Sequence, residues 1–136
     1  YVHQGWLTED HRYFIVGDEL DEAADGINTR SRVLDFTDLD NPILHHDYYG
    51  PTLAIDHNGY IVGDRFYLAS YKAGLREIDI SQIESKQMAE IGFFDSYPQG
   101  DGSGFSGAWS VYPFHESKNI IISDIQNGLF VVKREN

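Results

Sequence analysis

The stretch AGLREIDIS, residues 73–81, decides the fold because related segments occur twice more in the chain. TRSRVLDFT begins at Thr29, and NGLFVVK begins at Asn127. An offset of 44 residues aligns the first copy with the second, and an offset of 54 aligns Gly-Leu in the second copy with Gly-Leu in the third. A period of roughly forty to fifty residues is typical of propeller blades or repeat arrays.

The residues within each period predict strands. YFIVGDE (13–19), RFYLASY (65–71) and NIIISDI (119–125) supply β-branched or aromatic residues ahead of a turn. Only ISQIESKQMAEI (80–91) has helical character, and we expect it to form a connection with one helical turn. The sequence therefore predicts an all-β fold of short antiparallel strands.

Two short motifs mark the turns. Gly74 and Gly128 suit positions of positive φ, and Asn127-Gly128 indicates a two-residue hairpin. Arg30 stands at the corresponding place in the first copy, so that turn is expected to differ or to be longer. Asp35 and Asp79 follow the apolar pair of their copies and suit acceptance of backbone hydrogen bonds where a strand ends.

Composition excludes several classes of function. The 136 residues are 41% hydrophobic and carry a formal charge of −12, which disfavours nucleic acid and insertion at anionic membranes. Without cysteine the chain has no thiolate zinc site, cysteine nucleophile or disulfide. The chain starts with Tyr1 and shows no signal segment, so we expect a processed chain or a piece of a longer one.

Five longer segments resemble a known family. Residues 3–22, 28–42, 50–64, 71–81 and 104–114, among them HQGWLTEDHRYFIVGDELDE, are similar to the C-terminal half of the LVIVD-repeat proteins called choice-of-anchor B. The resemblance covers nearly the whole chain. It implies a secreted or surface-anchored β-propeller of bacteria or archaea, so an extracellular or cell-surface location is expected.

The expected architecture is a partial β-propeller of four-stranded antiparallel blades, approximately at residues 1–44, 45–96 and 97–136. A closed propeller needs about four to eight blades, which three units do not supply. The expected partners are the remaining blades of a longer chain or another copy of this one. A protein or glycan ligand is also compatible with such a module.

Two histidines occupy related places near the start of a period. His3 and His57 each precede a first strand, and equivalent side chains in successive blades converge near a propeller axis. Imidazoles bind divalent metals, and Asp56 or Asp64 is a candidate for an additional oxygen ligand. The alternative is a histidine that is hydrogen-bonded to the backbone of a neighbouring blade. Trp109 and Ser110 stand at the corresponding place in the third period, which argues against a ring of identical ligands.

The acidic segment TEDHRYFIVGDELDEAADG (8–26) is a candidate calcium site because calcium prefers carboxylate and carbonyl oxygens. Asp18 and Glu19 lie at the end of the predicted strand, and Glu19 is the best single candidate for a ligand. The segment lacks the spacing of an EF-hand loop. A solvated acidic face is the alternative and is favoured over the calcium site.

The glycine-rich stretch YPQGDGSGFSGAWSVYPF (97–114) predicts a long surface loop that ends at Trp109. Trp6, Trp109 and Asp101 are candidate ligand-binding residues, with the aromatic rings suited to sugars and Asp101 to a cation. No serine lies in a G-x-S-x-G elbow, and the stretch lacks the lysine of a phosphate loop.

Two functions follow from these features. The first is a non-catalytic extracellular or cell-surface module that binds protein, glycan or cations, with calcium or another divalent metal as the cofactor. The alternative is a metal-dependent hydrolase with its site near the propeller axis. The missing catalytic arrangement favours the first.

Overall fold

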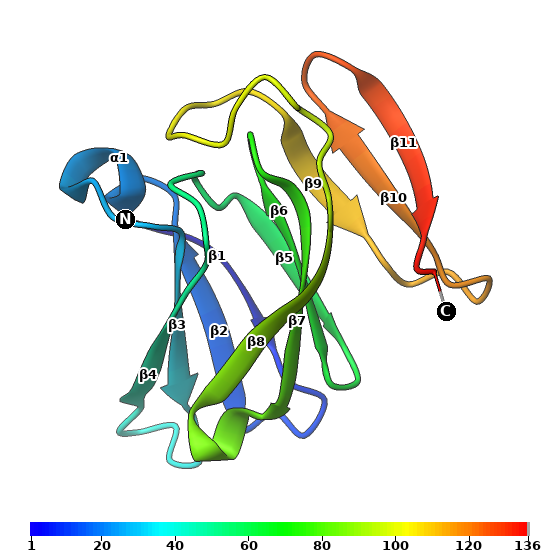
Figure 1. Cartoon of the computed structure of the whole chain (residues 1–136). Coiled ribbons are helices and arrows are strands. Elements are labelled where there is room, and N and C mark those ends of the chain that lie inside the picture. The colour runs from blue at the N-terminus through cyan, green and yellow to red at the C-terminus, as the bar shows by residue number, and fades with distance from the viewer. Residues whose placement is uncertain (136) are drawn as a thin grey trace.

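The structure, a computed structural model, describes residues 1–135 as three antiparallel β-sheets with two helical turns (Figure 1). The first sheet contains β1 (Val2–Leu7), β2 (Tyr13–Asp18), β3 (Arg30–Asp35) and β4 (Ile43–Tyr49). The second contains β5 (Asn58–Val62), β6 (Arg65–Ser70), β7 (Gly74–Gln82) and β8 (Gln87–Phe94). The third contains β9 (Ala108–Tyr112), β10 (Asn119–Asp124) and β11 (Gly128–Lys133). The helical turns are α1 (Asp21–Asp25) and the 3₁₀ turn η1 (Ile83–Ser85).

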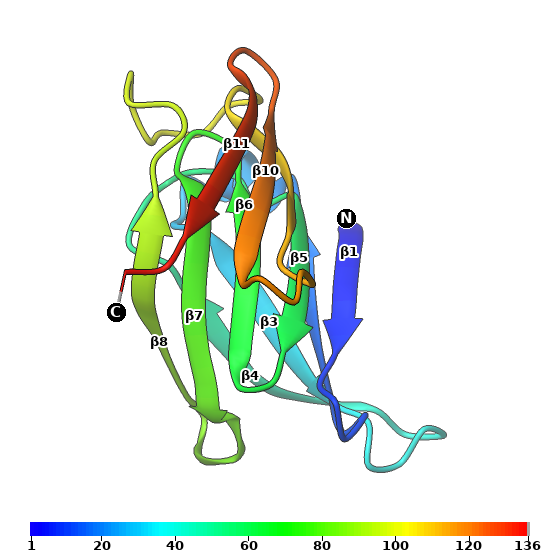
Figure 2. The ribbon, with the colours of Figure 1, turned by 90° about the vertical axis from the view of Figure 1, so that its right-hand side faces the viewer.

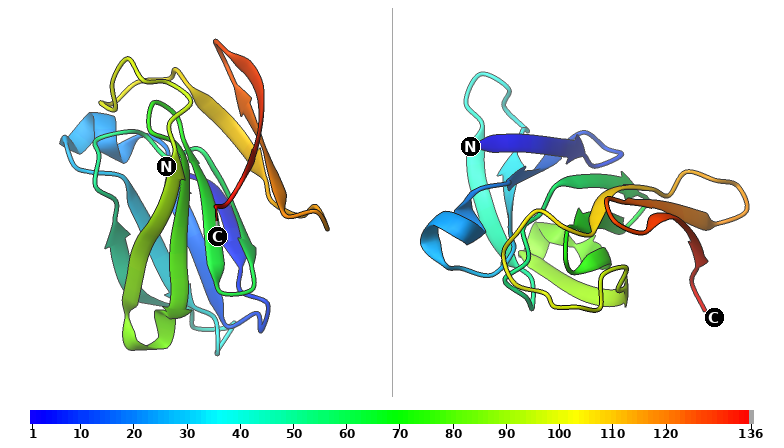
Figure 3. Two further views of the ribbon diagram at one scale, coloured as in Figure 1. Left: turned by 45° about the vertical axis from the view of Figure 1, so that its right-hand side comes forward. Right: turned by 90° about the horizontal axis from the view of Figure 1, so that it is seen from above.

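The three sheets follow one another in chain order, as the turned views show (Figures 2 and 3). Within each sheet, consecutive strands pair antiparallel in the order of the sequence. The first strands of the three sheets meet in succession, because β1 contacts β5 and β5 contacts β9. Residues at the ends of these first strands therefore lie close together although they belong to different sheets.

The sequence predicted the strands and the helical turn within residues 80–91, but it did not predict α1. The predicted strand segments 13–19, 65–71 and 119–125 form β2, β6 and β10, and the helical part of 80–91 is limited to η1. The first sheet extends to Tyr49, beyond the expected boundary at residue 44, because β4 pairs with β3. Neither helical segment within residues 1–135 has the length and apolar content needed to cross a membrane.

The hairpin that precedes each copy differs in length between the first two sheets. Only Tyr71–Ala73 separates β6 from β7, whereas the equivalent connection from β2 to β3 contains α1. The longer turn that Arg30 predicted is therefore confirmed. Gly74 and Gly128 have φ of 74° and 83°, as expected of left-handed turn positions.

Two details of the turns bear on the predictions. Asp124 pairs with Gly128, so three residues close the last hairpin instead of the predicted two. The predicted strand-end aspartates are confirmed: Asp35 Oδ1 accepts the backbone N–H of Thr37 at 2.8 Å, and Asp79 Oδ1 accepts that of Ser81 at 2.8 Å.

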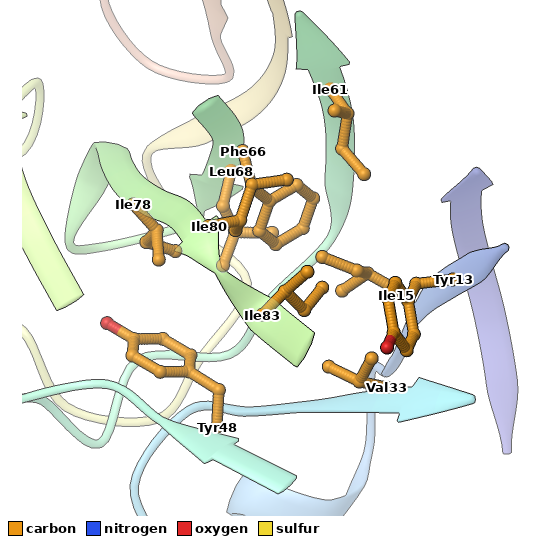
Figure 4. Close-up of a cluster of buried hydrophobic side chains, with 10 residues drawn as sticks. All are labelled: Tyr13, Ile15, Val33, Tyr48, Ile61, Phe66, Leu68, Ile78, Ile80 and Ile83. Atoms are coloured by element: carbon orange, nitrogen blue, oxygen red, sulfur yellow. The ribbon is translucent and has the colours of Figure 1, made fainter. Parts of the chain in front are cut away.

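The first two sheets pack through an apolar cluster (Figure 4). Phe66 and Ile15 are fully buried in it, and alternate residues of β2 and β6 supply its members, as half-buried strands require. The buried members are Tyr13, Ile15, Val33, Tyr48, Ile61, Phe66, Leu68, Ile78, Ile80 and Ile83. Each large side chain contributes about 1.5–3 kcal/mol on burial.

A second apolar cluster joins the second and third sheets. Its buried members are Ala69, Leu75, Ala108, Val111, Ile120 and Ile122. Phe94 and Phe130 pack against it, with ring centroids 5.3 Å apart. Each neighbouring pair of sheets therefore shares an apolar interface of its own.

Candidate metal centre

Three side chains from the first two sheets form a group of possible metal ligands: His3, Glu19 and His57. His3 lies on β1, Glu19 directly follows β2, and His57 directly precedes β5. The pairing register of β1 with β2 shifts between Val2 and Gln4, so His3 occupies a bulge. A bulge redirects a side chain from the regular alternation of the strand.

The group is compact. One ligand atom from each residue lies within 4.8 Å of the others. His3 Nδ1 is 3.3 Å from Glu19 Oε2, and His57 Nε2 is 3.7 Å from Glu19 Oε1. The imidazole rings of His3 and His57 have centroids 4.7 Å apart.

The hydrogen bond of His57 fixes which of its nitrogens is free. His57 Nδ1 donates to the backbone carbonyl of Trp109, since a carbonyl oxygen only accepts. The side chain is buried, and this burial lowers the pKa of His57 below its usual value. Burial thus favours the neutral ring, in which Nε2 carries the lone pair and lies 3.7 Å from Glu19 Oε1.

The Tyr71 hydroxyl holds Glu19 in place. The hydroxyl of Tyr71, a buried residue just after β6, donates to Glu19 Oε1 at 2.7 Å. Burial raises the pKa of Tyr71, with a further contribution from Glu19, so the hydroxyl keeps its proton and remains a donor. The Trp109 ring covers the other side of the group, with its centroid 4.1 Å from that of His57.

Two imidazole nitrogens and one carboxylate are a donor set that could hold a divalent transition metal. In a tetrahedral zinc site with bonds of about 2.1 Å, ligand atoms lie about 3.4 Å apart. His3 and His57 approach different oxygens of Glu19, at 3.3 Å and 3.7 Å, and one of these oxygens also accepts the Tyr71 hydroxyl. The Trp109 carbonyl accepts an outer hydrogen bond of the kind that orients a metal-binding histidine.

The structure brings together some of the predicted metal-site residues and not others. His3, Glu19 and His57 meet, whereas the exposed Asp64 lies in the turn between β5 and β6, at the opposite end of β5 from His57. Asp18 Oδ2 binds the amino group of Tyr1, and its Oδ1 accepts the backbone N–H of Leu20 at 3.2 Å. Asp18 therefore lies beside the group with its oxygens already in use.

The predicted ligand-binding residues lie in three separate places. Trp109 covers the metal group, while Trp6 packs edge-on against Tyr60 with ring centroids 4.8 Å apart. Trp6 and Phe114 line a groove of about 560 Å³. Asp101 lies in the loop before β9 and lines a different depression of about 590 Å³.

One polar residue near the group was missed as a functional candidate. The sequence favours a core role for Tyr71, although its hydroxyl positions Glu19. Glu22 is 1% exposed, so at this residue the acidic segment is not the solvated face that was expected. Asp56, expected as a possible oxygen ligand beside His57, is also 1% exposed.

The sequence matches no protein-family model and no curated protein.

Proposed function

We propose that this chain is a cation-binding β-propeller-type module that holds a divalent transition metal, zinc being the best fit, between His3, Glu19 and His57. The convergence of His3, Glu19 and His57, with Nδ1 of His57 held by Trp109 and Nε2 facing Glu19, is the observation that carries the proposal. Two imidazole nitrogens and one carboxylate favour a borderline cation over calcium, which prefers oxygen ligands only.

Isothermal titration of zinc into EDTA-treated protein tests the site. We expect one zinc per chain with a dissociation constant in the micromolar range or tighter. His57→Gln should weaken binding by at least about tenfold, because a first ligand is lost. His11→Asn is the matched control, since exposed His11 has a φ of 60° that asparagine tolerates. Unchanged zinc affinity in His57→Gln, or no binding by the unaltered chain, would contradict the proposal.

Hydrolysis at the same metal is the second candidate. Two histidines and a glutamate with an open fourth position form the ligand set of several zinc hydrolases. Binding without catalysis is favoured because the two grooves around Trp6 and Asp101 are lined by residues outside the ligand set. Zinc-dependent cleavage of an ester or phosphoester that His57→Gln abolishes would favour the hydrolase instead.

The propeller assignment rests on the arrangement of the sheets and on the resemblance to LVIVD-repeat proteins of the choice-of-anchor B family. The contacts of β1 with β5 and of β5 with β9 support it, since the innermost strands of neighbouring blades meet in this way. The resemblance to that family favours a location outside the cell or on its surface. Detection of the native protein in the surface or secreted fraction tests this location.

We propose that further sheets pack against the two outer sheets of this structure, the first and the third. Val2 and Leu44 are exposed on the first sheet, and Leu129 and Val131 are exposed on the third. Uncovered apolar strands of this kind bind other sheets. The occupants are the remaining blades of a longer chain or another copy, and light scattering at high concentration distinguishes them by whether this chain self-associates.

A further inference from the structure

A row of residues across the first sheet forms the floor of a buried polar site. Gln4 pairs with Gly17, and Gly17 pairs with Ser31, so these three positions share one face of the sheet. This is the face of Ile15 and Val33, which points toward the second sheet. The site therefore lies inside the junction of the first two sheets.

Asp56 enters this site from the connection between the two sheets. Its carboxylate lies directly over Gly17: a Cβ at position 17 would be 1.9 Å from Asp56 Oδ2 and 3.0 Å from Gln4 Nε2. Glycine at this position leaves the room that the carboxylate occupies. Asp56 and the Gln4 side-chain amide are therefore neighbours over one backbone position.

The polar atoms of the site have no partners among the described residues. Asp56 is 1% exposed, and neither of its carboxylate oxygens accepts a hydrogen bond. The Ser31 hydroxyl is fully buried and also unpaired, as are the amide oxygen and nitrogen of Gln4. Since a buried polar group without a partner costs free energy, this concentration of oxygens indicates a missing ligand.

Glu22 contributes a second carboxylate. Its Oε1 accepts the backbone N–H of Arg30, the residue before Ser31, at 3.0 Å, while Oε2 is buried without a partner. The charges of Glu22 and Asp56 interact, and burial together with this repulsion raises the pKa of Glu22 to about 8. Glu22 thus brings a buried, unpaired carboxylate oxygen to the backbone next to Ser31.

The nearby arginine does not neutralise this pair. The Arg30 guanidinium binds Asp21 Oδ2, with Nε at 2.8 Å, so its charge is balanced by Asp21. The Glu22 and Asp56 carboxyl groups therefore have no cationic partner among residues 1–135. One divalent cation that displaces their protons would neutralise both carboxylates.

We propose that Asp56 and Glu22, together with the Ser31 hydroxyl and the Gln4 amide oxygen, bind a calcium ion inside the junction of the first two sheets. All four groups offer an oxygen, Gln4 after a half-turn of its side-chain amide that brings Oε1 to the place of Nε2. Oxygens are the ligand set that calcium prefers and that zinc does not require. The ion would join the connection before β5 to β1, β3 and the segment of α1. The site is separate in ligands from the His3–Glu19–His57 group and does not depend on it.

Calcium titration of EDTA-treated protein tests this proposal. Calorimetry should detect one calcium per chain, and millimolar calcium should raise the melting temperature, because a ligand that binds only the folded state stabilises it. Asp56→Asn and Glu22→Gln should each lower the affinity by at least about tenfold. Ser31→Ala should weaken binding without changing the charge, and it serves if either charge variant fails to fold.

Two control variants distinguish calcium binding at this site from calcium binding elsewhere on the chain. Glu116→Gln removes an exposed carboxylate of the same type and should keep full calcium binding. His57→Gln should lose zinc but retain calcium. Three results would each overturn the proposed site. The first is that the unaltered chain binds no calcium, and the second is that Asp56→Asn and Glu22→Gln bind calcium as tightly as the unaltered chain. The third is that His57→Gln no longer binds calcium.

Discussion

The junction between the first and second sheets differs from the junction between the second and third in what it buries. The second junction is apolar, with Ala108, Ile120 and Ile122 at its centre. The first has an apolar cluster, but it also encloses Asp56, Glu22 and His57.

The difference arises from two connections. The connection from β2 to β3 carries α1, whose Glu22 folds back against the backbone of β3, and the connection from β4 to β5 supplies Asp56 and His57. The connection from β6 to β7 has only three residues and supplies no such acid. The following predictions test the contrast between the polar and the apolar junction.

Removing the Phe66 side chain should have the largest effect on folding. Phe66 is fully buried between the first two sheets and lies against Gly59, so Phe66→Ala leaves a cavity and should lower the free energy of unfolding by about 3–5 kcal/mol. Urea denaturation measures the change. Leu39→Ala, at a position that is 78% exposed, should change it by less than about 0.5 kcal/mol. A loss below about 1 kcal/mol in Phe66→Ala would mean that the two sheets are not packed as described.

The hairpin glycines of the second and third sheets should respond unequally to alanine. Both have positive φ, but a Cβ at Gly74 would lie 2.1 Å from the Phe94 carbonyl oxygen, whereas a Cβ at Gly128 meets nothing within 4 Å. Gly74→Ala should therefore cost about 2–3 kcal/mol and Gly128→Ala about 1 kcal/mol. Thermal unfolding of the two variants makes the comparison, and equal losses would contradict the close packing of β7 against the segment after β8.

The polar junction should give the metal-free protein a distinctive pH dependence. Burial and neighbouring Asp56 raise the pKa of Glu22 to about 8, and burial raises that of Asp56 to about 7. At neutral pH the folded state then holds protons that the unfolded state has released. The contribution of these two groups to the free energy of unfolding is fully present below their pKa values in the unfolded chain, and it is lost as the pH rises through their pKa values in the folded protein. The groups that face Glu22 are Asp21, Asp56 and Arg30.

In EDTA, the free energy of unfolding should fall by about 1–2 kcal/mol between pH 6.5 and 8. The lowered pKa values of His46 and His57 make the free energy of unfolding rise with pH, which is the opposite trend. That rise ends near the pKa of histidine in the unfolded chain, so it does not mask the fall in this window. Glu22→Gln should show a smaller fall over the same range in chemical denaturation. The same slope in both proteins would show that Glu22 is not the titrating group.

The sequence predicted the strands and part of the metal group, because both follow from the repeat. Equivalent positions of His3 and His57 before their first strands were visible from the spacing, and Glu19 was visible at a strand end. The sequence did not predict that Asp64 lies far from His57. The two residues are separated because His57 precedes β5 and Asp64 follows it.

Burial of the acidic residues could not be read from the sequence either. The run around Glu22 has the composition of a solvated face, and only the fold of α1 against Arg30 places that carboxylate inside. The bulge at His3 is a further example, because it depends on the pairing of β1 with β2 and leaves no mark in the composition.

The most direct test of the central claim is a crystal structure of zinc-loaded protein with diffraction measured at the zinc absorption edge. We predict one strong anomalous peak bonded to a nitrogen of His3, a carboxylate oxygen of Glu19 and Nε2 of His57. A peak at other residues, or no peak at full zinc saturation, would contradict the claim that the meeting of β1 and β5 builds a metal centre.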